Sequence, residues 1–335
     1  MEDKKITIKD IAALAGVSKS TISRYFNQGY VKEETREKIE KIIKDHNYQP
    51  NAFAQSLKAK DSKLIGVIAP TLSSVTSSRM LMALDGKLKQ EGYTPLIINT
   101  DHNQLDELES INKLWNMNVA GIVLLATKIT MAHRSLASKL NIPLIFLAQR
   151  IDEGVSIIND DYNAGREIGK YAGEMGHKDI IYLGVSNDDE AVGQIRKNGV
   201  LESLQEAGIS YVKVVETDFS FDETRKVVRE LLDTKIPTLF ICATDNIALA
   251  TYKELIDKGI KVPEEVSLIG FGGYETCKLI TPSLCSVRFN NEKAGRLTGE
   301  TMLKMIKGEP VRQLQTIDFT IDYGGSVKNL RGCNE

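Results

Sequence analysis

Near its N-terminus the chain reads Ile8-Lys9-Asp10-Ile11-Ala12-Ala13-Leu14-Ala15-Gly16-Val17-Ser18-Lys19-Ser20-Thr21-Ile22-Ser23-Arg24. It predicts two short helices. The first carries its apolar residues on one face and ends at Gly16, and Ser18 can cap the second only two residues later. The second helix keeps polar side chains on its outward face. Two such helices joined by a tight glycine turn are what a helix-turn-helix requires.

The flanking residues extend this pattern to a three-helix unit. Thr7 and Asp10 can cap the first helix. The Thr7 hydroxyl can accept a hydrogen bond from a backbone N–H, and the negative charge of Asp10 is favourable at the positive end of the helix. A third helix is expected over roughly residues 33–46, with an apolar stripe of isoleucines. Pro50 disfavours helix at the residue before it, and residues 52–58 are polar and too short to form a stable helix alone.

From Lys63 onward, continuous apolar runs alternate with helix-like stretches. This alternation predicts parallel strands buried by helices, and its extent favours two sheets over one. We therefore expect an all-α helix-turn-helix head followed by an α/β core of two parallel-sheet subdomains. The strands are expected at Leu64–Ala69, Pro95–Asn99, Gly121–Ala126, Pro143–Ala148, Ile180–Gly184, Tyr211–Val215, Thr238–Ala243 and Val266–Gly270.

Charge is unevenly distributed along the chain. Residues 1–60 hold 12 Lys and Arg against 8 Asp and Glu, whereas the 335 residues together carry a formal net charge of −2. A basic first segment on an acidic remainder fits a head that contacts nucleic acid, because phosphates need cations only where the duplex lies.

Several classes of protein find no support in the sequence. No run approaches the apolar length of a membrane helix, and residues 1–5 lead into a polar stretch rather than the apolar core of a signal peptide. The four cysteines are widely spaced without a CxxC pair, so we expect reduced thiols, no metal and no cofactor. The four histidines are dispersed, and neither paired catalytic carboxylates nor a Gly-rich phosphate loop is present. We expect a cytoplasmic protein that is not an enzyme.

Three motifs together identify a family. The stretch quoted above, the segment Val31…Thr35-Arg36-Glu37-Lys38-Ile39 and the pattern Asn47-Tyr48-x-Pro50-Asn51-x-x-Ala54-x-x-Leu57 closely resemble the head and hinge of the lactose-repressor (LacI) family of bacterial regulators. The similarity continues across the remaining chain. One departure is Lys32, where most members carry a Ser that caps the third helix; a cap is worth about 1 kcal/mol.

The resemblance implies a double-stranded DNA contact surface on the second helix. Lys19 and Ser20 occupy its two base-reading positions and Arg24 a third, although Lys19 could instead contact a phosphate. Ser18 is equally well explained as a helix cap. The residues that the resemblance suggests as phosphate donors are Thr7, Ser18, Thr21, Ser23 and Asn27.

The resemblance also implies a hinge helix at residues 51–57 that folds when operator is bound and enters the minor groove. Leu57 lies at the position that wedges between base steps, with burial against the core as its alternative. Asn51, Ala54 and Lys58 complete this expected contact surface. The implied organisation is a head at 1–50, a hinge and linker at 51–61, and an effector-binding and dimerisation core at 62–335.

The family's core is similar to periplasmic sugar-binding proteins, with two subdomains and a ligand in the cleft between them. The N-subdomain is expected at about 62–160 and 289–319, and the C-subdomain at about 161–288 and 320–330. A sugar-like effector is implied. The candidate contacts transferred by resemblance are Arg196, Phe219, Asp245 and Gln149.

Alternatives to these roles differ from residue to residue. Phe219 could be core and Asp245 could cap the following helix, whereas the sequence offers no structural role for Arg196. Many members read Gly-Tyr/Phe-Asp-Asp where this chain has Gly270-Phe271-Gly272-Gly273-Tyr274, so the usual carboxylate is absent. This form resembles the branch that responds to disaccharides such as sucrose or trehalose, with Tyr274 as a further contact. Ser74 and Arg79 lie near the loop after the first strand, where ligand could reach them.

The sequence therefore predicts a repressor of a carbohydrate-utilisation operon that binds a pseudo-palindromic operator as a homodimer and is relieved by a sugar. The polar end from Gly324 favours a dimer over a tetramer. Three rivals remain open: a global regulator with a phosphocarrier protein as corepressor, a transporter's sugar-binding protein, and a sugar-modifying enzyme. The missing export signal opposes the second, and the missing catalytic constellation opposes the third.

Overall fold

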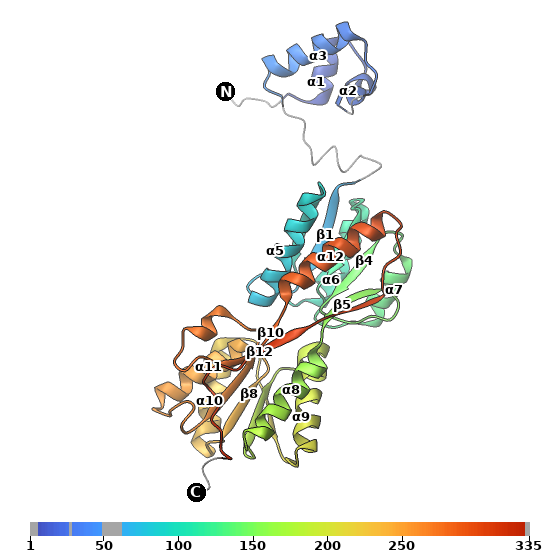
Figure 1. Cartoon of the computed structure of the whole chain (residues 1–335). Helices are drawn as coiled ribbons and strands as arrows, with labels where there is room; N and C mark the ends of the chain where they lie inside the picture. Colours follow the sequence, from blue (N-terminus) through green and yellow to red (C-terminus); the bar gives the residue numbers. More distant parts are fainter. Residues whose placement is uncertain (1–5, 27–28, 49–61, 332–335) are drawn as a thin grey trace. The chain divides into compact units, whose positions relative to one another are not determined.

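The computed structural model describes residues 6–26, 29–48 and 62–331, and the chain divides into two units, residues 1–62 and 63–335 (Figure 1). The described residues of the first unit form three helices, α1 (Ile8–Ala15), α2 (Lys19–Phe26) and α3 (Glu33–Asp45). They pack around the fully buried side chains of Ile11, Ile22 and Ile39. The predicted helix-turn-helix head is confirmed.

Local hydrogen bonds explain where these helices begin and end. Thr7 and Asp10 form a reciprocal capping box at the start of α1, and Gly16 ends that helix with a left-handed φ of +70°. Ser18 Oγ accepts a hydrogen bond from the Thr21 backbone N–H at 3.2 Å, so Ser18 caps α2. Lys32 precedes α3 without a side-chain cap.

The second unit contains two six-stranded sheets. The first sheet has the order β11-β5-β4-β3-β1-β2 and is parallel throughout. We call the part built on it the N-subdomain. Its strands are β1 (Leu64–Ala69), β2 (Thr94–Asn99), β3 (Gly121–Leu124), β4 (Leu144–Leu147), β5 (Val155–Asn159) and β11 (Leu314–Ile317).

The second sheet has the order β12-β10-β9-β8-β6-β7 and defines the C-subdomain. It is parallel except for β12, which pairs antiparallel with β10. Its strands are β6 (Ile180–Gly184), β7 (Lys213–Glu216), β8 (Leu239–Cys242), β9 (Ser267–Phe271), β10 (Cys285–Phe289) and β12 (Phe319–Asp322). The fold class predicted from sequence, a helical head and a core of two mainly parallel sheets, is confirmed.

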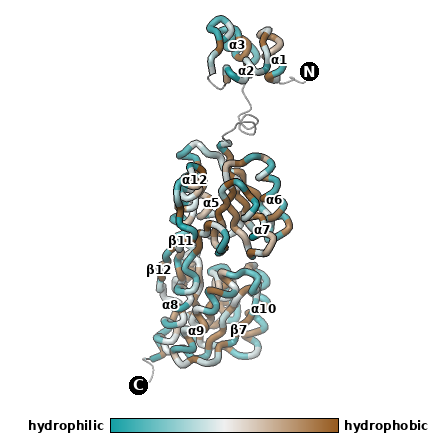
Figure 2. Tube along the Cα trace, turned by 90° about the vertical axis from the view of Figure 1, so that its right-hand side faces the viewer, coloured by the Kyte–Doolittle hydropathy of each residue, from teal (hydrophilic) through white to brown (hydrophobic). Residues whose placement is uncertain are grey.

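Helices cover both sheets, and Figure 2 shows hydrophobic residues gathered along the strands inside each subdomain. The N-subdomain carries α5 (Val75–Gln90), α6 (Gln104–Asn116), α7 (Met131–Lys139) and α12 (Asn291–Ile306). The C-subdomain carries α8 (Asp161–Glu174), α9 (Lys197–Glu206), α10 (Phe221–Thr234) and α11 (Asp245–Asp257). Six of these helices begin at a side chain that accepts a backbone N–H, namely Ser74, Asn103, Thr130, Ser220, Thr244 and Asn290.

The chain passes between the subdomains at three places in the sequence: between β5 and α8, between β10 and α12, and between β11 and β12. In Figure 1, α12 lies beside α5 although more than 200 residues separate them in sequence. Their close approach needs Gly295, because a Cβ there would lie 2.1 Å from the backbone oxygen of Met80.

The structure corrects several strand predictions. The strand expected at Tyr211–Val215 is β7 at Lys213–Glu216, because its pairing with β6 begins at Lys213 and Tyr211 is exposed. Most other strand ends shift by one or two residues. Four strands were not anticipated: β5, β10, β11 and β12. The last two are short and partly exposed, so they lack the continuous apolar run that marked the others.

Candidate functional site

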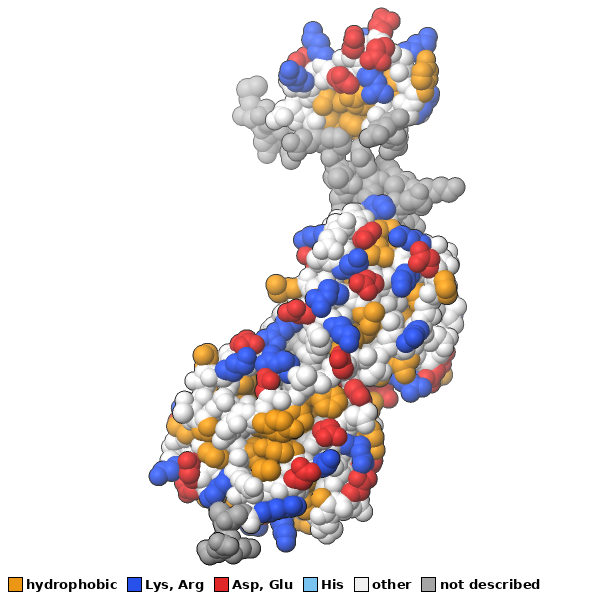
Figure 3. All heavy atoms as spheres, in the orientation of Figure 1, with side chains coloured by type: hydrophobic (Ala, Val, Ile, Leu, Met, Phe, Trp, Pro, Cys, Tyr) orange, Lys and Arg blue, Asp and Glu red, His pale blue; other side chains and the backbone are white. Residues whose placement is uncertain are grey.

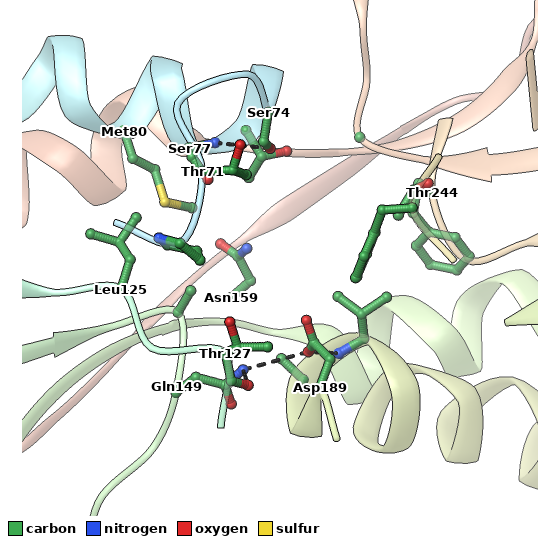
Figure 4. Close-up of a pocket in the computed structure, with 18 of the residues that line it drawn as sticks. Thr71, Ser74, Ser77, Met80, Leu125, Thr127, Gln149, Asn159, Asp189 and Thr244 are labelled. Atoms are coloured by element: carbon green, nitrogen blue, oxygen red, sulfur yellow. Dashed lines mark hydrogen bonds between the residues drawn. The ribbon is translucent and has the colours of Figure 1, made fainter. Parts of the chain in front are cut away.

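A pocket of about 380 Å³ is lined by both subdomains, a size suited to a small ligand (Figure 4). Loops that follow the carboxyl ends of parallel strands supply its walls, which is where open α/β sheets bind ligands. The N-subdomain contributes Thr71, Ser74, Ser77, Thr127, Gln149 and Asn159. The C-subdomain contributes Asp189, Thr244, Asn246 and Tyr274.

Three residues that line this pocket have left-handed backbone conformations although none is glycine. Their φ angles are +49° at Asp101, +61° at His102 and +71° at Ala148. Such conformations cost free energy and cluster at ligand-binding sites. The strained loop after β2 presents the imidazole of His102 to the pocket.

His102 faces Phe219 across the pocket. The two rings are nearly parallel, with an interplanar angle of 9° and centroids 6.5 Å apart. They belong to different subdomains, since His102 follows β2 and Phe219 follows β7. Phe219 is 37% exposed and lines the pocket, so it is not a core residue. Its face is available to an apolar ring surface.

Arg196 lines the pocket but is also held by a buried carboxylate. Its Nε and Nη2 donate to Asp161 Oδ1 at 2.9 and 2.6 Å, and its Nη1 donates to the Ala243 backbone oxygen at 2.5 Å. Both residues are buried, with side-chain exposures of 7% for Arg196 and 5% for Asp161. The guanidinium lies over the rings of Phe271 and Phe289, at 4.9 and 5.2 Å. The structure thus supplies the structural role for Arg196 that the sequence did not suggest.

Glycines allow this ion pair to form. Arg196 ends a π-helical segment, η1 (Glu190–Arg196), that leads into α9, and such segments occur frequently at functional sites. A Cβ on Gly165 of α8 would lie 2.3 Å from the Arg196 backbone oxygen, and one on Gly199 would lie 2.2 Å from the Tyr162 backbone oxygen. Because α8 and α9 cross at these glycines, Asp161 at the start of α8 can reach Arg196.

Burial is the main cause of the pKa shifts of two carboxyl groups around the pocket. It raises the pKa of Asp161 above its ordinary value, although the Arg196 guanidinium favours the charged form. Burial also raises the pKa of Asp189, against the effect of the hydrogen bond from the Val192 backbone N–H at 2.9 Å. Asp189 is therefore a buried hydrogen-bonding group at the pocket wall.

Asp245 is fully buried and is not among the described residues that line the pocket. Its Oδ1 accepts from the Ser286 hydroxyl at 2.6 Å, and its Oδ2 accepts from the Tyr274 backbone N–H at 2.8 Å. Asp245 does not cap α11 with its side chain, since Thr244 does so. The carboxylate instead holds the loop that carries Tyr274.

This loop explains the two glycines that depart from the family pattern. Gly272 and Gly273 have φ angles of +150° and +59°. A Cβ on Gly273 would lie 2.6 Å from Arg288 Cβ, so a side chain there would clash as well as strain the backbone. The glycines place Tyr274 in the pocket wall, where it is buried. Burial raises the pKa of Tyr274.

Polar contacts join the subdomains on two sides of the pocket. Gln149 Nε2 donates to the Thr127 backbone oxygen at 3.0 Å and lies 3.5 Å from Asp189 Oδ1 (Figure 4). Lys128 pairs with Asp188 at 2.5 Å beside this contact. Arg79 does not line the pocket; it donates to the Gly273 backbone oxygen at 3.3 Å and borders a smaller cavity near the start of α12.

Asn159 is the residue at this site with an unsatisfied polar atom. It ends β5, is 8% exposed and projects between the Ser74 loop and Gln149 in Figure 4. Its Oδ1 is buried, and none of the residues that the structure describes donates a hydrogen bond to it. Native structures rarely leave such atoms unpaired, so Asn159 is a candidate to accept a hydrogen bond from a ligand.

The predicted contacts Ser74, Gln149, Arg196, Phe219 and Tyr274 therefore meet at one pocket, whereas Arg79 and Asp245 lie outside its lining. Sequence reasoning missed Asp189, Asn159, His102, Thr127 and Asn246. Each follows or ends a strand, so a search for polar residues just beyond the strands would have found them.

The head presents a polar surface on α2. Ser18, Lys19, Ser20, Ser23 and Arg24 are exposed, while Ile22 of the same helix is buried. Ser18 Oγ lies 2.7 Å from Ser20 Oγ and 3.0 Å from Thr21 Oγ1, so these hydroxyls form a local network. Thr7 is exposed in its capping box. The predicted contacts Asn27, Asn51, Ala54, Leu57 and Lys58 lie outside the described residues.

The described residues 6–26, 29–48 and 62–331 also bear on metal binding and thiol chemistry. Within these ranges, no group of His, Cys, Asp and Glu side chains is arranged to hold a metal ion. Cys242, Cys277 and Cys285 are free, buried thiols whose pKa values are raised by burial. Cys333 lies outside the described residues. None of the described helices is both long and apolar enough to span a membrane.

These features place the chain in a class of two-part proteins, in which a helix-turn-helix head is joined to a two-lobed core with a ligand-sized pocket. Comparisons agree with this class. Residues 7–51 match the model "Bacterial regulatory proteins, lacI family", and residues 171–327 match "Periplasmic binding protein-like domain".

Relatives extend these matches over almost the whole chain. The sucrose operon repressor of Staphylococcus xylosus is 35% identical over 312 residues, which cover 93% of this chain and 97% of that protein. The ribose operon repressor of Bacillus subtilis is 29% identical, with 95% and 97% covered. A structure of the lac repressor dimer bound to operator and the anti-inducer ONPF has a TM-score of 0.83 at 24% identity, covering 97% of this chain and all of that one.

The chain belongs to the lacI family of bacterial regulatory proteins. It is a DNA-binding transcriptional regulator and not an enzyme.

Proposed function

We propose that this regulator represses a carbohydrate-utilisation operon and that a sugar effector relieves the repression, with a disaccharide such as sucrose as the first candidate. The observation that carries the proposal is the pocket, because it combines aromatic faces with hydroxyl, amide and carboxyl groups. Phe219 and Tyr274 suit the apolar face of a sugar ring, while Gln149, Asn159 and Asp189 suit its hydroxyls. The similarity to a protein named sucrose operon repressor supports the same reading.

The proposed DNA contacts lie on the exposed face of α2. Lys19, Ser20 and Arg24 would reach base edges in the major groove, and Thr7, Ser18, Thr21 and Ser23 would hold phosphates. The hydroxyl network of Ser18, Ser20 and Thr21 would rearrange toward the duplex. Asn27 and the hinge residues Asn51, Ala54, Leu57 and Lys58 remain part of the proposed surface, with Leu57 as the minor-groove wedge.

The chain is proposed to act as a cytoplasmic homodimer that binds a pseudo-palindromic operator. Exposed apolar side chains on the core favour a partner, including Met82 on α5 at 74% exposure and Leu279 at 81%. Figure 3 shows hydrophobic side chains gathered on one face of the C-subdomain. Large exposed apolar patches are typical of interaction surfaces. The functional division proposed is a head at 1–50, a linker at 51–61 and a core at 62–335.

The proposed mechanism is a population shift. Because both subdomains line the pocket, a ligand that contacts both would favour one angle between them, and its effect on DNA affinity could not exceed its preference for that state. The contacts of Gln149 with Asp189 and of Lys128 with Asp188 would then change with the angle.

The test is sugar-dependent release of DNA. Duplexes would be selected from a random pool with the purified chain, and binding would then be followed by fluorescence anisotropy in the presence of mono- and disaccharides. The proposal expects one sugar to lower the affinity for the selected duplex by about 5- to 150-fold, the usual range of allosteric coupling. A selected duplex whose affinity no sugar changes would contradict the effector role while leaving DNA binding intact.

A further inference from the structure

The charges that line the pocket restrict what the effector can be. Among the described lining residues, Arg196 is the only Lys or Arg, and three carboxyl groups, Asp101, Asp161 and Asp189, share the lining with it. Of the described residues that line the pocket, His102 is the only other one whose side chain can carry a positive charge.

The one guanidinium is already neutralised. Its Nε and Nη2 donate to Asp161, and its Nη1 donates to the Ala243 backbone oxygen. A phosphate that recruited Arg196 would have to compete with a buried carboxylate for these donors, and breaking a buried pair is costly. Two nearby cationic side chains have partners outside this pocket. Lys128 forms an ion pair with Asp188, and Arg79 donates a hydrogen bond to the Gly273 backbone oxygen.

Two polar side chains at the pocket can accept hydrogen bonds from a ligand. Asn159 Oδ1 is buried and has no hydrogen-bond partner among the described residues, and the Asp189 carboxyl accepts from the Val192 N–H and lies 3.5 Å from Gln149 Nε2. A sugar hydroxyl can donate to such oxygens, whereas an ionised phosphate offers only acceptors. The hydroxyls at the start of α5 are engaged locally, since Thr71 pairs with Ser73 and Ser74 caps the helix.

We propose that the effector is an uncharged, polyhydroxylated ligand and that this pocket rejects its phosphorylated form. The inference rests on the proposed function, because it concerns the ligand of the same regulatory pocket. The regulator would then respond to a sugar that reaches it unmodified and not to one that has first been phosphorylated.

The experiment uses the full chain and matched pairs of probes: sucrose with sucrose 6-phosphate, trehalose with trehalose 6-phosphate, and fructose with fructose 6-phosphate. Affinity would be measured by isothermal titration calorimetry and checked by the ligand-induced rise in Tm. We expect at least one neutral probe to bind and its phosphorylated partner to bind at least about tenfold more weakly, which is about 1.4 kcal/mol. A phosphorylated probe that binds as tightly as its neutral partner, or a panel with no neutral binder, would overturn the inference.

A variant makes the electrostatic cause testable. Asp189→Asn removes a lining carboxylate that forms no ion pair with any described Lys or Arg, and asparagine can still cap η1. We expect the preference for the neutral probe to fall about tenfold in this variant and to stay unchanged in Glu109→Gln, which removes an exposed charge on α6. An unchanged preference in Asp189→Asn would contradict the electrostatic argument. Binding of the selected duplex without ligand, measured in parallel, shows separately whether the proposed DNA function holds.

Discussion

The Arg196 guanidinium and the Asp161 carboxylate form an ion pair buried between η1 and α8, with donor–acceptor distances of 2.9 and 2.6 Å. Removing one partner of a buried pair leaves an unpaired charge, which costs roughly 3–5 kcal/mol. We therefore expect Asp161→Ala to lower the free energy of unfolding of the core by that amount, measured by urea denaturation and circular dichroism.

The same two helices supply the control. Arg166 of α8 pairs with Glu206 of α9 at 2.6 Å, but Glu206 is largely exposed. Exposed pairs contribute about 0–1 kcal/mol, so Glu206→Ala should change stability little. Equal losses in the two variants would show that burial does not set the strength of the Arg196 pair.

A second prediction concerns the close crossing of α8 and α9. Gly165→Ala would place a Cβ 2.3 Å from the Arg196 backbone oxygen, so the helices must separate and Arg196 must move away from Asp161. We expect a loss of about 1–3 kcal/mol in the free energy of unfolding. Gly86→Ala on α5 is the matched control, since nothing lies within 4 Å of its Cβ, and helix propensity predicts a gain of up to about 1 kcal/mol. If both substitutions raised the free energy of unfolding, or both lowered it, the packing argument would be refuted.

We expect the Phe219 ring to contribute to the affinity for the ligand but not to the affinity for DNA. Phe219→Ala removes a partly exposed ring that faces His102 across the pocket, so any sugar that stacks there should bind at least about tenfold more weakly. Phe221→Ala is the control, because Phe221 is similarly exposed but does not line the pocket. Calorimetry gives the affinity, and anisotropy with the selected duplex should be unchanged in both variants. Arg196→Ala is a poorer probe, since it also unpairs Asp161.

The environment of His177 predicts that the stability of the folded chain depends on pH. Its Nε2 lies 3.1 Å from the Lys328 backbone oxygen and its Nδ1 lies 3.1 Å from Thr238 Oγ1. Burial lowers the pKa of His177 below its ordinary value of 6.5. Above that pH both folded and unfolded chains hold it neutral, whereas below it the unfolded chain takes up a proton that the folded chain resists, so stability falls. The decline in Tm between pH 7.5 and 5.5 should be smaller in His177→Gln than in the unmodified chain.

Sequence reasoning reached the fold class because its signals are local. The glycine turn at Gly16, the cap at Thr7 and the apolar runs of the central strands each depend on neighbours in sequence. Strands β11 and β12 were missed because they are short and half-exposed, and their partners β5 and β10 lie far away in the chain.

The pocket was only partly predictable for a related reason. Resemblance placed Arg196, Phe219 and Gln149 there, but the partner of Arg196 lies 35 residues away and is brought near by a helix crossing. Asp245 was assigned to the ligand because its position after β8 suggested the cleft. Its burial against Ser286 and the Tyr274 backbone depends on the loop at Gly272, which no local pattern specifies.

We propose that the exposed side chains of Lys19, Ser20 and Arg24 on α2 read a specific duplex sequence. Competition anisotropy tests this with the full chain, a selected palindromic duplex and a scrambled duplex of equal length and composition, at physiological salt. We expect a preference of at least about 1,000-fold for the palindrome, as specific regulators show, and a large loss of that preference in Lys19→Ala. Equal affinity for both duplexes, with and without sugars, would contradict it.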